Sequence, residues 1–212
     1  RLPNFLSPQY RAEAQALNQK YLAAIRAIDP AGLAQAQRIS YDMFLYERER
    51  EQRSEQYPSH LLPLDQKGSL LTLMQSLGSG TNAQPFATVQ DYDNWLRRLD
   101  GLVVWMDQAI VNMREGMAQG VVQPRPVMEK VLVQLQAMDV TDAKSSVYFG
   151  PVKDFPDSFS SEDRARLTAE FTRTLEQSVL PAYRRLRDFV RDEYLPKTRS
   201  TVAWTALPNG PA

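Results

Sequence analysis

The sequence predicts an all-α protein, built as an antiparallel bundle of long helices with one long loop and a short strand-like C-terminal tail. Three observations support this class. Apolar residues recur every three or four positions over several long segments, which is the period of an amphipathic helix. Capping residues, prolines and glycines stand mainly at the ends of these segments. Apolar residues make up 43% of the chain and charged residues 24%, which is ordinary for a globular protein.

The first helix is predicted from Ser7, which can cap a helix, and from Pro8 at the first helical position. Its apolar stripe consists of Tyr10, Ala14, Leu17, Tyr21, Ala24 and Ile28. The helix ends near Asp29-Pro30, and a second helix follows from residue 33 into the charge-dense residues 47–51. Opposite charges three residues apart can pair there across one turn, so we interpret this run as a solvated helix face.

The longest regular pattern begins at Thr88, after a short helix predicted over residues 70–77. Thr88 and Asp91 resemble a capping box. Large apolar residues then keep three-four spacing: Tyr92, Trp95, Leu99, Leu102, Met106, Ala109 and Met113. Without partner helices, several of these side chains would stand in water at a cost of about 1.5–3 kcal/mol each. We therefore expect this helix to be the buried spine of the bundle.

The second half of the chain continues the bundle after Gly120, the expected C-cap of the spine. A helix over residues 127–138 is predicted to return against the spine. The periodicity then disappears over residues 140–159, where aromatic residues accumulate, so we expect a long loop pinned by buried rings. Ser160 opens a final long helix, in which Pro181 predicts a kink rather than a domain boundary.

The last residues predict a different element. Residues 201–207 begin like a β-branched strand that has no sheet to join. The predicted organisation is therefore a helical domain over residues 1–200 and the start of a truncated following segment over residues 201–212. Trp204 and Leu207 would have no later residue to cover them. We expect poorly satisfied backbone hydrogen bonds in this tail, and either disorder or pairing with another copy.

Composition excludes several classes of function. Lys plus Arg equals Asp plus Glu at 25 each, so no net field attracts nucleic acid or an anionic membrane. No apolar run is long enough for a transmembrane helix. Cysteine is absent and histidine occurs once, which removes thiolate nucleophiles, Cys-ligated zinc and any histidine-rich metal site. We therefore predict no catalytic residue, no metal ligand and no cofactor within this chain.

His60 is the single histidine and has two interpretations. It is either a partly exposed loop residue hydrogen-bonded to nearby backbone, or a residue that contacts a ligand. Trp95 and Trp105 could form a ligand box, but their helical spacing favours core packing. Carboxylate pairs such as Asp91 with Asp93 lack the calcium-hand pattern and are better explained as helix caps and surface charge.

Several segments together resemble a known bacterial family. They are Ile39-Ser40-Tyr41-Asp42-Met43-Phe44-Leu45, His60-Leu61-Leu62-Pro63-Leu64-Asp65-Gln66-Lys67-Gly68, Pro85-Phe86-Ala87-Thr88 with Asp91-Tyr92, Asn112-Met113-Arg114-Glu115-Gly116, and Ala206-Leu207-Pro208-Asn209-Gly210. On these motifs the chain resembles the family called domain of unknown function 885, from about residue 30 to its end. Members look like gluzincin-type zinc metallopeptidases, whose zinc-binding helix lies downstream of the segment equivalent to this one.

The resemblance implies a role in a longer protein. The chain would be an N-terminal helical part that walls a substrate groove against a C-terminal, zinc-bearing half, in an exported or periplasmic protein or a lipoprotein. Zinc would belong to the full-length protein, and this chain alone would be inactive. A peptide substrate would contact loops, for which we name His60, Asp65, Gln66, Tyr148, Phe149 and Asn209. The alternative is a non-catalytic helical interaction module.

Overall fold

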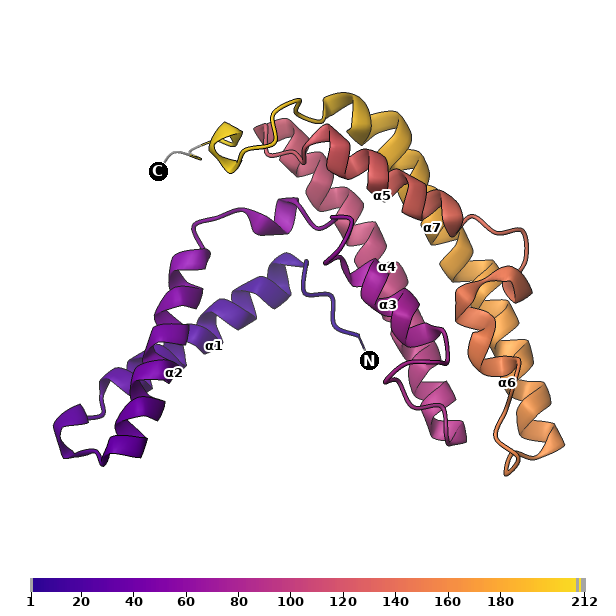
Figure 1. The fold of residues 1–212 in the computed structure, drawn as a ribbon, viewed down its shortest axis with the longest axis horizontal. Helices are drawn as coiled ribbons and strands as arrows, with labels where there is room; N and C mark the ends of the chain where they lie inside the picture. Colours follow the sequence, from indigo (N-terminus) through magenta and orange to yellow (C-terminus); the bar gives the residue numbers. More distant parts are fainter. Residues whose placement is uncertain (1, 209, 211–212) are drawn as a thin grey trace. The chain divides into compact units, whose positions relative to one another are not determined.

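The computed structural model describes residues 2–208 and residue 210, and it confirms the all-α class (Figure 1). Seven α-helices lie in the described residues: α1 (Pro8–Arg26), α2 (Gln35–Ser54), α3 (Leu70–Gly78), α4 (Val89–Gln119), α5 (Arg125–Ala137), α6 (Ser161–Thr174) and α7 (Leu180–Phe189). These residues contain no β-strand, only an isolated bridge between Pro124 and Arg199. The chain divides into two compact units, residues 5–59 and residues 1–4 with 60–212. The domain boundary predicted at residue 200 stays a prediction.

The smaller unit is a hairpin of α1 and α2. Ser7 caps α1 by accepting a hydrogen bond from the Tyr10 amide at 3.2 Å, and Pro8 stands at the first helical position, as predicted. The two helices are joined across their interface by Asn18, whose Nδ2 donates to the Arg48 carbonyl at 3.0 Å while its Oδ1 accepts from Arg48 Nη1 at 3.0 Å. In the charge-dense part of α2, Arg50 pairs with Glu47.

The spine prediction for α4 is confirmed. Thr88 and Asp91 form the predicted capping box, and Gly120 ends the helix with a positive φ of 73°. The predicted seam is fully buried at Trp95, Leu99, Leu102 and Met106, with Tyr92 1% exposed. Helices α6 and α7 pack along α4 in the larger unit, and α5 packs against α7 (Figure 1). Trp105 is also 1% exposed, as the core-packing interpretation of both tryptophans requires.

The predicted final long helix continues past Pro181 with a local change in its helical winding, and it is not divided between two domains. Between α6 and α7, residues 175–179 form a π-helical turn, and Pro181 stands in the first turn of α7. A proline removes one amide donor and crowds the carbonyl four residues earlier, so a wider turn directly before it accommodates the ring. A second π-helical turn over residues 190–194 precedes Pro196. The irregularity expected at Pro181 is therefore a π-turn.

The aromatic loop over residues 140–159 is pinned by rings, as predicted. Tyr148 is completely buried, and its hydroxyl lies 2.7 Å from the hydroxyl of Tyr183. Burial raises the pKa of Tyr183 to about 12 and holds the pKa of Tyr148 well above its ordinary value, so both phenols stay protonated at neutral pH. The loop also approaches α3 closely, because a Cβ on Gly150 would lie 2.2 Å from the Ser79 carbonyl oxygen.

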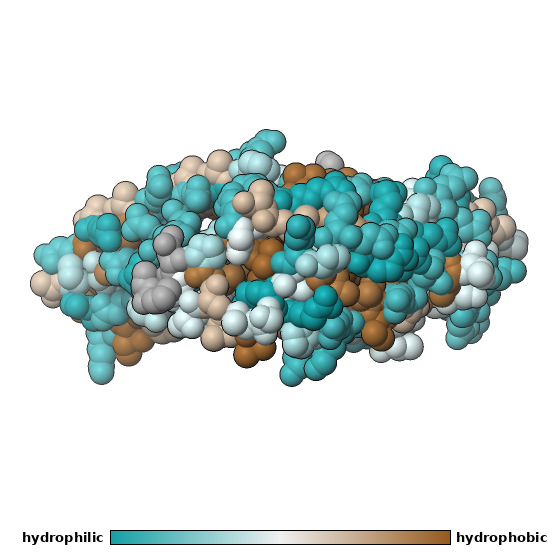
Figure 2. Space-filling model, turned by 90° about the horizontal axis from the view of Figure 1, so that it is seen from above, coloured by the Kyte–Doolittle hydropathy of each residue, from teal (hydrophilic) through white to brown (hydrophobic). Residues whose placement is uncertain are grey.

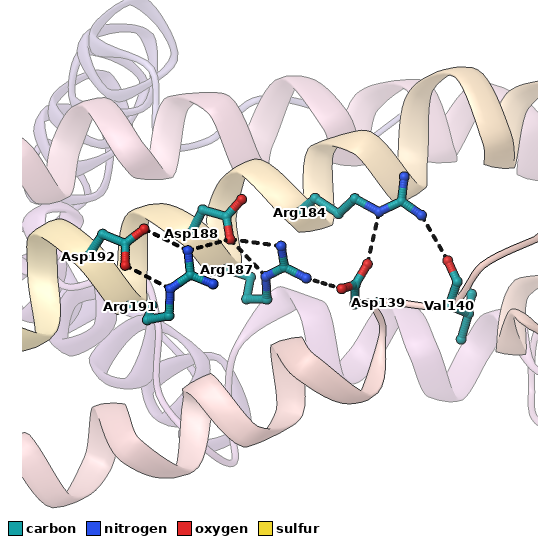
Figure 3. Close-up of polar contacts among 7 residues, drawn as sticks. All are labelled: Asp139, Val140, Arg184, Arg187, Asp188, Arg191 and Asp192. Carbon is teal, nitrogen blue, oxygen red and sulfur yellow. Dashed lines mark hydrogen bonds and ion pairs between the residues drawn. The ribbon is translucent and has the colours of Figure 1, made fainter.

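An ion-pair ladder ties the end of α5 to α7 (Figure 3). Asp139 accepts from Arg184 Nε at 2.8 Å and also pairs with Arg187, while Arg184 Nη2 donates to the Val140 carbonyl at 2.9 Å. The hydrogen bond from Arg184 lowers the pKa of Asp139. These groups are partly exposed, so the ladder orients the start of the aromatic loop more than it stabilises the fold.

The strand-like interpretation of residues 201–207 is wrong, because this segment forms a 3-10 turn over Trp204–Ala206. Arg199 explains the difference. Its Nη1 donates to the carbonyls of Thr201 at 2.6 Å and Ala203 at 2.8 Å, which supplies donors that a sheet neighbour would otherwise provide. Trp204 remains 71% exposed, in line with the expectation that nothing in this chain covers it.

Replacing Gly78 by Ala should destabilise the larger unit. A Cβ at this position would lie 2.5 Å from Tyr148 Cδ1 and 2.6 Å from Trp95 Cζ2, both on buried rings that cannot move away. Overpacking of this kind costs about 1–3 kcal/mol of unfolding free energy, measurable by urea denaturation. Gly32→Ala is the control, since a Cβ there meets nothing within 4 Å. Equal stability of the two variants would contradict the packing described around Trp95.

Candidate functional site

Residues 60–68 form a segment whose carbonyl groups are held by amide side chains from the helical core. Asn112 Nδ2 on α4 donates to the His60 carbonyl at 3.1 Å. Gln123 Nε2 donates to the Leu64 carbonyl at 2.9 Å, and Gln134 Nε2 on α5 donates to the Gln66 carbonyl at 2.9 Å. Leu61 and Leu64 are buried. The segment is therefore a fixed surface element, although it lies outside the α-helices.

The three predicted site residues of this segment all take part in the hydrogen bonds that fix it. His60 and Gln66 are half-buried and each contributes a carbonyl to the amide clamp. Asp65 Oδ1 accepts from the amides of Lys67 at 2.6 Å and Gly68 at 2.5 Å, so its carboxylate organises the turn that follows. These contacts agree with the loop interpretation of His60. Substrate contact by the three residues stays a prediction.

The other predicted site residues lie apart from this segment. Tyr148 and Phe149 are buried, at 0% and 5% exposure, and Tyr148 is bonded to Tyr183 in the core. Their environment is that of packing residues, although their predicted contact with substrate remains untested. Asn209 lies outside the described residues.

A groove opens beside the aromatic loop, which we call the aromatic groove. Its volume is about 580 Å³, and its walls include Ser79, Thr81, Phe86, Tyr92, Asp154 and Phe155. Sequence reasoning named none of these as site residues. Two signals were present nonetheless, because Phe86 and Tyr92 belong to a family-like motif and Phe155 belongs to the loop expected to be pinned by rings. The sequence pattern does not show that residues 79–92 and 150–156 lie side by side, because they meet only in the folded chain.

Tyr92 organises the floor of the aromatic groove. Its ring stacks on Phe155 with the centroids 5.3 Å apart and meets Phe86 edge-on at 5.1 Å. Its hydroxyl donates to the Pro151 carbonyl at 2.9 Å. Burial, and then the charge of Asp154, raise the pKa of Tyr92 to about 12, so the phenol is a hydrogen-bond donor at neutral pH and not a base.

The described part of the chain supplies no set of metal ligands. Within it, no group of three or more His, Cys, Asp or Glu side chains could hold a metal ion. Zinc sites in hydrolases use three protein ligands and an open position for water, and the chain has one histidine and no cysteine. Among the described helices, none is both long enough and apolar enough to span a membrane.

Asn112→Ala should loosen the clamped segment. Asn112 is 3% exposed, it donates to the His60 carbonyl, and its Oδ1 accepts from Gln108 Nε2 at 2.9 Å. The substitution leaves a carbonyl without its donor, which costs about 1–3 kcal/mol. Hydrogen exchange should accelerate over residues 60–66. Gln119→Ala, which removes an exposed bond to Glu115 on the same helix, is the control and should leave exchange unchanged. Similar exchange in both variants would argue against the clamp.

Comparison with known proteins identifies the chain at the level of family and fold. No curated protein matches it. A solved structure described as "the putative lipoprotein from Colwellia psychrerythraea" has the same fold, with a TM-score of 0.80, 16% sequence identity and coverage of 97% of this chain. This chain spans only 37% of the length of that one. The family described as "Bacterial protein of unknown function (DUF885)" matches residues 1–212. The chain therefore belongs to the DUF885 family.

Proposed function

We propose that this chain is the non-catalytic helical part of a longer zinc-dependent peptidase of the gluzincin type, and that it forms one wall of the substrate groove. The observation that carries the proposal is a formed aromatic groove in a chain whose described residues lack a set of metal ligands. Membership of DUF885 and the 37% coverage of the similar solved chain support a place in a longer protein. An exported or lipoprotein form is part of this proposal.

The proposal divides the chemistry between two parts of one protein. Zinc does not fit the residues present here, because His60 is the single histidine, cysteine is absent, and no group of three or more possible ligands lies in the described residues. Activation of water and cleavage of the peptide bond therefore belong to the other part. This chain contributes binding, which speeds a reaction when it holds the substrate in a reactive orientation.

The groove has the features that an extended peptide requires. Phe86 and Phe155 are half-buried and present apolar surface for a side chain. Ser79 and Thr81 bring hydroxyl groups, and the exposed Asp154 brings a negative charge. Ligand sites commonly combine an apolar lining with a few polar groups that fix orientation. Gly80 adopts a φ of 83° in the wall of the groove, where its backbone approaches Pro151.

A helical interaction module is the second candidate. The observation that favours it is the set of large apolar side chains left exposed on α1 and α2, including Leu17, Met43 and Tyr46 at 53%, 65% and 58%. Exposed apolar surface on this scale marks an interface.

The test uses the full-length protein that contains this chain. We expect stoichiometric zinc by elemental analysis and hydrolysis of a mixed peptide library that a chelator abolishes. Asp154→Asn should raise KM about 2- to 10-fold, the equivalent of about 0.5–1.5 kcal/mol for one lost polar contact, with little change in kcat or zinc content. Asp157→Asn is the control, because Asp157 is exposed on the same loop and does not line the groove.

Two results would contradict the proposal. If the full-length protein contained no zinc and hydrolysed no peptide, the proposed peptidase function would be wrong and the interaction module would be favoured. If the enzyme were active but Asp154→Asn and Asp157→Asn had equal KM values, the aromatic groove would not bind substrate. The chain could then still be part of a longer peptidase.

A further inference from the structure

The α1–α2 hairpin has an apolar groove on its surface, which we call the hairpin groove. It is lined by Ala14, Leu17, Tyr21, Phe44, Arg48 and Glu51 and has a volume of about 570 Å³. Leu17, Tyr21 and Phe44 are 53%, 46% and 42% exposed. Tyr21 and Phe44 meet edge-on with their centroids 6.3 Å apart, so the two helices contribute one continuous apolar surface. Figure 2 shows hydrophobic residues among hydrophilic ones on one face of the molecule.

The hairpin leaves most of the apolar residues of its predicted stripe exposed. In α1 only Asn18 and Leu22 are buried, and in α2 none of the 20 residues is buried. The predicted stripe of α1 therefore faces outward at Tyr10, Leu17, Tyr21 and Ile28. Two-helix hairpins gain most of their stability from packing an apolar face against a further element. The α-helices of residues 5–59 are α1 and α2, so no third α-helix of this unit covers the hairpin groove.

Charge argues against nucleic acid or an anionic lipid surface as the occupant. Residues 5–59 contain seven Lys and Arg and seven Asp and Glu, so the hairpin has no net charge. At the rim of the groove a cation and an anion stand together, Arg48 and Glu51. The guanidinium of Arg48 also lies over the Phe44 ring, 5.3 Å from its centroid. An apolar partner with a mixed polar edge matches this surface.

The comparison in length indicates where that partner comes from. The match covers 97% of this chain but only 37% of the similar solved chain, so that protein holds further polypeptide outside the matched region. A groove between two helices accepts a third helix, whose side chains pack along both. We propose that the hairpin groove seats an apolar helix supplied by the same longer polypeptide from outside residues 1–212. The inference rests on the proposed function only in requiring the longer protein.

Photo-crosslinking in the full-length protein tests the inference directly. Benzoylphenylalanine replaces Leu17 in one variant and Leu73 in the control, because both leucines are exposed, at 53% and 54%, and Leu73 lies on α3 outside the hairpin. After irradiation, mass spectrometry identifies the linked peptide. We expect residue 17 to crosslink, at a yield independent of protein concentration, to an apolar peptide outside residues 1–212 of the same molecule. Residue 73 should not give that product.

Every other product overturns the inference. A crosslink between two copies that grows with concentration would assign the hairpin groove to a dimer interface. A crosslink within residues 1–212, a lipid adduct, or no product above the Leu73 control would each exclude a helix from the longer polypeptide. The readout needs neither zinc nor hydrolysis, so an inactive full-length protein that gives the expected crosslink would refute the proposed function and support the inference.

A charge placed in the groove provides a second measurement. Leu17→Glu should lower the Tm of the full-length protein by several degrees, because the carboxylate would lose its hydration under the seated helix. Leu73→Glu is the matched control and should leave the Tm nearly unchanged, since Leu73 lies outside the hairpin. Equal Tm values for the two variants would contradict the seated helix even if both proteins fold.

Discussion

The apolar seam of α4 is the constraint on which the larger unit depends. At 31 residues the helix extends for about 46 Å, and its buried side chains include Tyr92, Trp95, Leu99 and Trp105. Burying a seam of that length requires neighbours throughout, which α6, α7 and the π-helical turns that follow them provide. The seam also positions the surface features. Its N-terminal end places Tyr92 under the aromatic groove, and Asn112 near its other end holds the segment that begins at His60.

Local physics made much of this fold predictable. The caps at Thr88 and Gly120 and the three-four spacing along α4 depend only on residues that are close together in the sequence. These predictions were confirmed. Features that depend on distant partners were not predictable. Periodicity shows that α1 has an apolar stripe, yet it cannot show whether anything covers Leu17. The turn at Trp204 follows from the guanidinium of Arg199, which donates hydrogen bonds to carbonyls of the tail. Secondary-structure propensities do not include such side-chain contacts.

The candidate site shows the same division. Residues 60–68 were singled out because they resemble a family motif. The structure shows why this motif mixes polar and apolar residues: Leu61 and Leu64 are buried, while amide side chains donate hydrogen bonds to the carbonyls of His60 and Leu64. The aromatic groove was missed because its walls are far apart in sequence. Both features belong to a DUF885 chain that spans 37% of the length of a similar solved chain.

Native-state hydrogen exchange across the chain tests most directly whether stability resides in the α4 seam. The account predicts that amides between Leu99 and Ala109 exchange only through global unfolding, because the surrounding side chains are buried. Amides of α1, where only Asn18 and Leu22 are buried, should exchange faster through local opening that denaturant hardly changes. Protection of α1 equal to that of α4 in residues 1–212 would contradict the account, since it would show a hairpin that is stable without any further helix.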